Sequence, residues 1–142
     1  MKSILVLSLF LAATAQAHIK LGTYAGTSPT QGACSVRIEE VSFENNVRHP
    51  LNERVKARIG NDLFVLQHPP VVNVAQSSVT FTHDLLQGVL ATPTGARALI
   101  IEMSHEAGKE GPLAFTLIDH QWRQNARTAL ACQKLVFVAP LR

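Results

Sequence analysis

Basic residues at every second position form the clearest chemical pattern in the chain. The cations are Arg54, Lys56 and Arg58, and they alternate with apolar residues within Arg54–Ile59. Because the side chains of a strand point alternately to its two faces, this spacing places all three cations on one face. Such a row can bind an anionic partner: a phosphate, a lipid head group or an acidic protein groove. It can equally be a solvated face that resists aggregation, and we favour this second interpretation.

Three acidic residues lie shortly before the basic row. They are Glu39, Glu40 and Glu44. If their strand is the neighbour of the basic strand, they would neutralise the row. Glu39 and Glu40 also stand where the apolar alternation shifts by one residue, which predicts a β-bulge.

Histidines are the next candidates for chemistry. The six are His18, His49, His68, His83, His105 and His120. None of them forms an H-x-H or H-x₃-H pair, so a metal site would have to be assembled by the fold. At a mature N-terminus, the amine and imidazole of His18 could chelate copper, although we interpret this residue as incidental.

Catalytic motifs are not evident in the chain. Ser104, His105 and Glu106 are adjacent, as are Asp119 and His120, but neighbours on a strand point to opposite faces. The chain contains no G-x-S-x-G, H-E-x-x-H or P-loop sequence. We therefore predict no catalytic residue, metal or cofactor.

The N-terminus has the order of a secretory signal peptide. A basic start with Lys2 precedes an apolar run over Ile4–Ala13, and Ala15 and Ala17 supply the small residues of a cleavage site. We predict a signal peptide over 1–17, a single domain over 18–142, and a secreted or periplasmic protein. The apolar run is too short to span a bilayer, which needs roughly 20 residues, and no later segment is apolar enough to cross a membrane. We expect no stable membrane span.

Export determines how the two cysteines are interpreted. Cys34 and Cys132 are the only pair, and in an oxidising compartment they predict a disulfide between the two ends of the domain. Two free buried thiols are the alternative.

The composition also excludes some classes: 46% apolar and 16% charged residues exclude a disordered chain. A net charge of +3 gives no reason to expect nucleic-acid binding.

The elements that must position these residues are short strands separated by turn formers. Gly60-Asn61 between two strand-like runs predicts a tight hairpin, and Thr92–Gly95 predicts another turn. The stretch Gly26–Gly32 predicts a loop. The segment 84–90 fits a strand or a helical turn, and 122–130 fits strand–turn–strand better than a helix. We predict an all-β fold: an antiparallel barrel or closed sandwich of about seven to nine strands, with one disulfide.

Gly22-Thr23-Tyr24-Ala25-Gly26 resembles the G-x-W opening of lipocalins and related calycin barrels, with Tyr in place of Trp. The layout of a small exported barrel is also similar to bacterial lysozyme-inhibitor domains. The resemblance implies an antiparallel barrel with a ligand-binding or inhibitory role.

Taken together, these features predict an exported, non-enzymatic binding domain for a small ligand or a protein partner. One alternative is a small exported hydrolase or metalloenzyme that uses His18, His105 or His120. A further alternative is an inhibitor of a cell-wall hydrolase, which would project an exposed loop into the enzyme's cleft.

Overall fold

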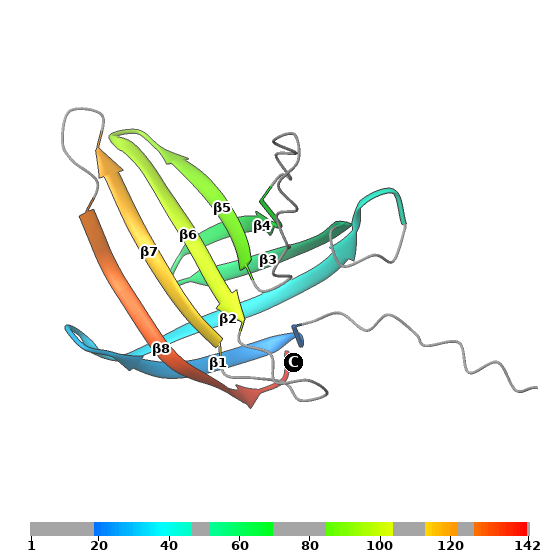
Figure 1. Cartoon of the computed structure of the whole chain (residues 1–142), viewed down its shortest axis with the longest axis horizontal. Helices are drawn as coiled ribbons and strands as arrows, with labels where there is room; N and C mark the ends of the chain where they lie inside the picture. The colour runs from blue at the N-terminus through cyan, green and yellow to red at the C-terminus, as the bar shows by residue number, and fades with distance from the viewer. Residues whose placement is uncertain (1–18, 47–51, 70–84, 104–112, 122–126, 142) are drawn as a thin grey trace, which may run out of the picture.

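The chain forms a closed antiparallel barrel in which each strand pairs with its neighbours in sequence and β8 closes on β1 (Figure 1). This computed structural model describes residues 19–46, 52–69, 85–103, 113–121 and 127–141, the side chains of 127–129 excepted. The strands are β1 (Gly22–Ser28), β2 (Gly32–Phe43), β3 (Glu53–Ile59), β4 (Asp62–Gln67), β5 (Leu85–Thr92), β6 (Gly95–Met103), β7 (Leu113–Gln121) and β8 (Arg127–Ala139). The 3-10 turn η1 (Glu44–Asn46) follows β2. The predicted all-β barrel is confirmed.

Alternation along the strands builds the core. Every second residue points into the barrel, where these side chains are fully buried: Val36 and Ile38 of β2, Val55 and Ala57 of β3, Phe64 and Leu66 of β4, Leu99 and Ile101 of β6, Phe115 and Leu117 of β7. Each such side chain contributes about 1.5–3 kcal/mol when it leaves water, apart from the smaller alanine. An eight-stranded barrel is just wide enough for side chains of this size to fill it.

The turns and the bulge that the sequence predicts are present. Ile59 pairs with Asp62 across a two-residue hairpin, and Gly60 has a φ of 59°, which suits the first central position of a II′ turn. Thr92 pairs with Gly95 across the second predicted turn. The pairing of β2 with β3 shifts register between Ile38 and Glu40, which confirms the bulge.

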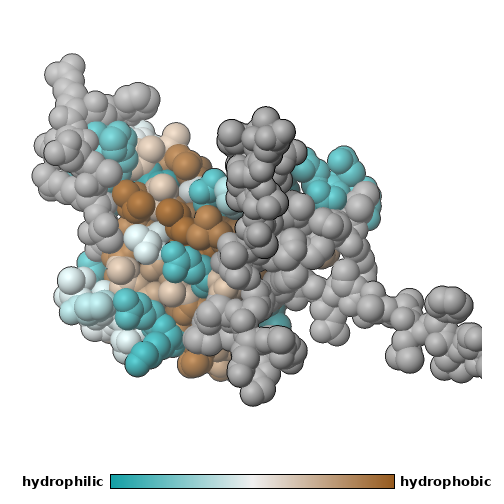
Figure 2. Space-filling view, viewed as in Figure 1, coloured by the Kyte–Doolittle hydropathy of each residue, from teal (hydrophilic) through white to brown (hydrophobic). Residues whose placement is uncertain are grey.

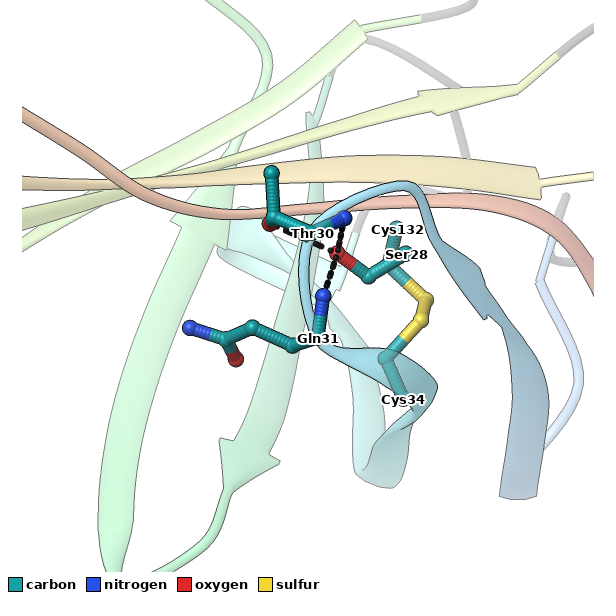
Figure 3. The surroundings of a disulfide bond; sticks show 5 residues. All are labelled: Ser28, Thr30, Gln31, Cys34 and Cys132. Atoms are coloured by element: carbon teal, nitrogen blue, oxygen red, sulfur yellow. Dashed lines mark hydrogen bonds between the residues drawn. A yellow bond between two sulfur atoms is a disulfide. The ribbon is translucent and has the colours of Figure 1, made fainter.

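One predicted boundary is wrong. The loop expected over Gly26–Gly32 is shorter, because β1 continues to Ser28 and β2 begins at Gly32. Gly26 serves a close approach inside the sheet, since a Cβ there would lie 2.4 Å from the carbonyl oxygen of Gln133 in β8. The turn is held by Ser28, whose Oγ accepts hydrogen bonds from the backbone N–H groups of Thr30 and Gln31 (Figure 3).

The structure resolves two ambiguous segments and leaves others outside its range. Residues 85–92 form strand β5, and the chain is a strand again from Arg127. The predicted signal peptide over 1–17, the strand candidates at 71–74 and 78–83, and residues 122–126 lie outside the described residues. Within the described residues, no helix has the length and apolar character needed to cross a membrane.

The predicted disulfide joins β2 to β8 across the intervening strand β1 (Figure 3). The Cα atoms of Cys34 and Cys132 are 6.0 Å apart. Two strands separated by a third in a flat sheet would be about 9.5 Å apart, so the sheet bends sharply here. The bend has two local causes: Gly26 has no side chain, and β8 bulges at Lys134, whose φ is 54°.

Candidate functional site

The basic row lies on the outer face of β3, and its cations are paired with acidic residues of the neighbouring strand β2 and of η1. Arg58 holds Glu39 through two hydrogen bonds of 2.6 and 3.1 Å. The Nζ atom of Lys56 lies 2.5 Å from a carboxylate oxygen of Glu40. The predicted neutralisation therefore occurs.

Arg54 is the least tightly held cation of the row. Its guanidinium lies 3.8 Å from the carboxylate of Glu44, and its side chain is 49% exposed. By contrast, the hydrogen bond from Arg58 holds the pKa of Glu39 below its ordinary value, although burial opposes this effect. The same hydrogen bond raises the pKa of Arg58. Within the row, Arg54 therefore keeps the most room for a further anion.

Two histidines fall within the described residues, and they occupy different environments. His68 is buried beside Glu53, with 3.9 Å between Nε2 and a carboxylate oxygen and side-chain exposures of 2% and 1%. His120 is exposed at the end of β7. His18, His49, His83 and His105 lie outside the described residues. In the part of the chain that the structure describes, no three His, Cys, Asp or Glu side chains form a group able to hold a metal ion.

Sequence reasoning missed a charged cluster at one end of the barrel. Arg97 occupies an inward-facing position of β6, and its Nε lies 2.7 Å from a carboxylate oxygen of Asp119 in β7. Its Nη1 contacts Asp62, at the start of β4. Both carboxylates accept from one guanidinium, so the cluster ties β4 to β6 and β7. Alternation would have placed Arg97 on the inward face, but nothing local indicates Asp62 as its partner.

A polar pocket of about 220 Å³ lies beside this cluster. It is lined by Thr92, Thr94, Gly95, Ala96, Arg97, Asp119, His120 and Gln121. Because Arg97 is already engaged by two carboxylates, the pocket lacks an uncommitted guanidinium for an anionic ligand.

The junction of β4 and β5 is the weakest part of the barrel wall. Among the described residues these strands share one paired position, Gln67 with Gln87. Next to that position the two backbones are in direct contact, because a Cβ on Gly88 would lie 2.3 Å from the carbonyl oxygen of Val65. By contrast, β5 pairs with β6 along its whole length.

A groove of about 460 Å³, here called the seam groove, lies over this junction. It is lined by Val65, Gln67, Gln87, Gly88, Val89, Ala98, Leu99 and Ile100. Val65 is 49% exposed and Val89 is 71% exposed. Figure 2 shows apolar residues gathered on this face, over β5 and β6. A volume of this size is within the range of ligand-binding sites, roughly 300–1,000 Å³.

A second apolar strip lies on the last strand. Val136, Phe137 and Val138 of β8 are all exposed. The ring of Phe137 also packs edge-on against Tyr24, with 5.4 Å between centroids. Tyr24 is buried, and its hydroxyl accepts a hydrogen bond from the N–H of Lys20 and donates one to the same residue's carbonyl oxygen. Phe137 of this strip therefore also contributes to the packing between β8 and β1, where the barrel closes.

Comparison with protein-family models, curated proteins and solved structures finds no match to this chain. The resemblance of Gly22–Gly26 to the opening of calycin barrels therefore stays a prediction.

Proposed function

We propose that this protein is an exported binding domain that acts without catalysis and holds its partner in the seam groove. The observation that carries the proposal is an open groove lined mostly by apolar residues, among them Val89, which is 71% exposed. Apolar residues gathered around an open groove are one mark of an interaction site. Export is supported by the signal-like residues 1–17 and by the disulfide, which is typical of oxidising compartments.

The seam groove is a better candidate than the other surfaces. In the basic row, Lys56 and Arg58 already bind carboxylates closely, so a new anion would have to displace them. The barrel interior is occupied by large side chains such as Phe64 and Phe115. Among the described residues, no ion pair is formed by the residues that line the seam groove.

The hydrolase alternative receives less support from the described geometry. Glu53 and His68 are the residue types of an acid–base pair, but both side chains are at most 2% exposed, so a substrate cannot reach them. His120 is accessible, but its neighbour Asp119 is committed to Arg97.

The proposal can be tested with an apolar fluorescent probe, 1-anilinonaphthalene-8-sulfonate. We expect saturable binding to the purified protein and a loss of at least about tenfold in affinity for Val89→Lys, since a buried valine contributes about 1.5–3 kcal/mol. The matched control is Val138→Lys, a valine on β8 that is 55% exposed and far from the groove in sequence. Equal affinity of Val89→Lys and wild type, or an equal loss in the control, would contradict the proposal.

A further inference from the structure

We infer that the ligand of the seam groove is a small uncharged amphiphile, with an apolar body and one polar end such as a carboxamide. The inference rests on the proposed function and names the class of ligand that the same groove would take. Three features of the groove support it: a pair of amides, a row of apolar side chains beside them, and the charges that flank both.

The amide pair consists of two glutamines that face each other across the seam. Gln67 of β4 and Gln87 of β5 are directly paired, and both line the groove. Directly opposed residues of antiparallel strands point to the same face, with about 5 Å between their Cβ atoms. Each amide carries two N–H donors and an oxygen acceptor. The pair can therefore donate hydrogen bonds to the polar end of a ligand and accept them from it.

The apolar row lies next to the amides. Two residues along each strand from the paired glutamines are Val65 on β4 and Val89 on β5, which lie on the same outer face. Ala98 of β6 extends this row, because it pairs with Val89. A strand rises about 3.3 Å per residue, so the amides and the valines are about 7 Å apart. A ligand contacts both if a short chain or a ring joins its apolar body to its polar end.

The charges around the groove favour no ion. Among the described residues, those that line the groove are all uncharged. The basic row lies one strand away, and its cations Arg54 and Lys56 each face a carboxylate. On the opposite side of the groove, Glu102 of β6 is exposed and carries a negative charge. A charged head group would lose water in the groove without gaining a counter-ion there, whereas an uncharged group would exchange water for the two amides.

The experiment compares three ligands that share an eight-carbon chain and differ in their polar end: octanamide, octanoate and octylammonium. Each is used at pH 7 to displace the uncharged fluorescent probe N-phenyl-1-naphthylamine from the purified protein. We expect octanamide to bind at least about fivefold more tightly than either ion, because only its head group replaces water with amide hydrogen bonds. Equal affinities for all three ligands, or a preference for either ion, would overturn the inference.

Substitution of Gln87 tests whether its amide holds the polar end of the ligand. Gln87→Leu removes the donors and the acceptor, so it should weaken octanamide about fivefold while changing the affinity for N-phenyl-1-naphthylamine less than twofold. An equal change for both ligands would overturn the assignment of Gln87.

A charge placed at the same position tests where the head group lies. Gln87→Glu should reverse the preference, so that octylammonium binds more tightly than octanamide. The matched control is Gln133→Glu, which adds the same charge at an exposed glutamine of β8 and should leave the preference unchanged. The same reversal in both variants would mean that only net charge matters, and would overturn the assignment.

Failure of this inference is distinguishable from failure of the proposed function. If the polar end of the ligand makes no difference but N-phenyl-1-naphthylamine binds at least tenfold more weakly to Val89→Lys, the seam groove remains an apolar site and the inference alone is overturned. If Val89→Lys binds the probe as tightly as wild type, the proposed function fails together with the inference.

Discussion

Removing the disulfide should cost the protein much of its stability. Cys34 and Cys132 are 98 positions apart, so the bridge closes a loop of nearly the whole domain. In the chain-entropy model, closing a loop of about 100 residues stabilises the folded state by about 4.7 kcal/mol. Typical domains have net stabilities of about 5–15 kcal/mol, so this single bridge is a large share. We expect the double variant Cys34→Ala/Cys132→Ala to lose about 4–5 kcal/mol.

The measurement is equilibrium urea unfolding followed by circular dichroism, on the oxidised protein, the reduced protein and the double variant. With a slope of about 2 kcal/mol/M, the midpoint should fall by roughly 2 M. Alanine is preferred to serine because Cys132 is fully buried, and a hydroxyl there would add a desolvation cost. Losses below about 1 kcal/mol in both reduced and variant proteins would refute the reasoning, because the unfolded chain would then gain little freedom.

Three further substitutions test local features by the same unfolding assay. Gly88→Ala should destabilise the protein by about 1–3 kcal/mol, because the new Cβ would lie 2.3 Å from the carbonyl oxygen of Val65. Where a glycine is unstrained, the same change stabilises a protein, so a gain in stability would show that β4 and β5 separate freely. Lys134→Gly should stabilise by about 1 kcal/mol, because its φ of 54° disfavours a side chain, and a loss would argue against strain at the bulge. Glu39→Gln should destabilise at neutral pH. Because the pKa of Glu39 is lower in the folded protein, its ionised carboxylate stabilises the fold fully above about pH 4.3, and this stabilisation is lost as the pH falls through the lowered pKa. A difference in unfolding free energy between wild type and Glu39→Gln that does not change with pH would contradict the ion pair with Arg58.

Local pattern was sufficient for much of the fold. Alternation around Val55 and Phe115 identified the inward faces, and Gly60 identified a two-residue hairpin. The bulge followed from a one-residue shift in alternation near Glu39, and the disulfide followed from Cys34 and Cys132 being the only pair. The faces, the hairpin and the bulge are each determined by residues close in sequence. The disulfide joins distant residues, but two cysteines allow only one pairing.

The candidate site could not be predicted in the same way. Alternation determines which face a residue occupies, but not how far a ladder runs between two strands. The single pairing of Gln67 with Gln87, and hence the seam groove, depends on the curvature of the whole barrel. The contact of Arg97 with Asp62 is likewise long-range, joining residues 35 positions apart. Sequence reasoning instead singled out the basic row, whose residues do not line the seam groove.

Chemical-shift mapping of the ¹⁵N-labelled protein tests the central claim most directly. The protein is titrated with 1-anilinonaphthalene-8-sulfonate, and backbone amide shifts are followed. The account predicts that the largest changes fall at Val65, Gly88 and Val89, with Val138 nearly unaffected. Changes concentrated on the apolar strip of β8, or spread evenly over the barrel, would contradict the assignment of the seam groove as the binding site.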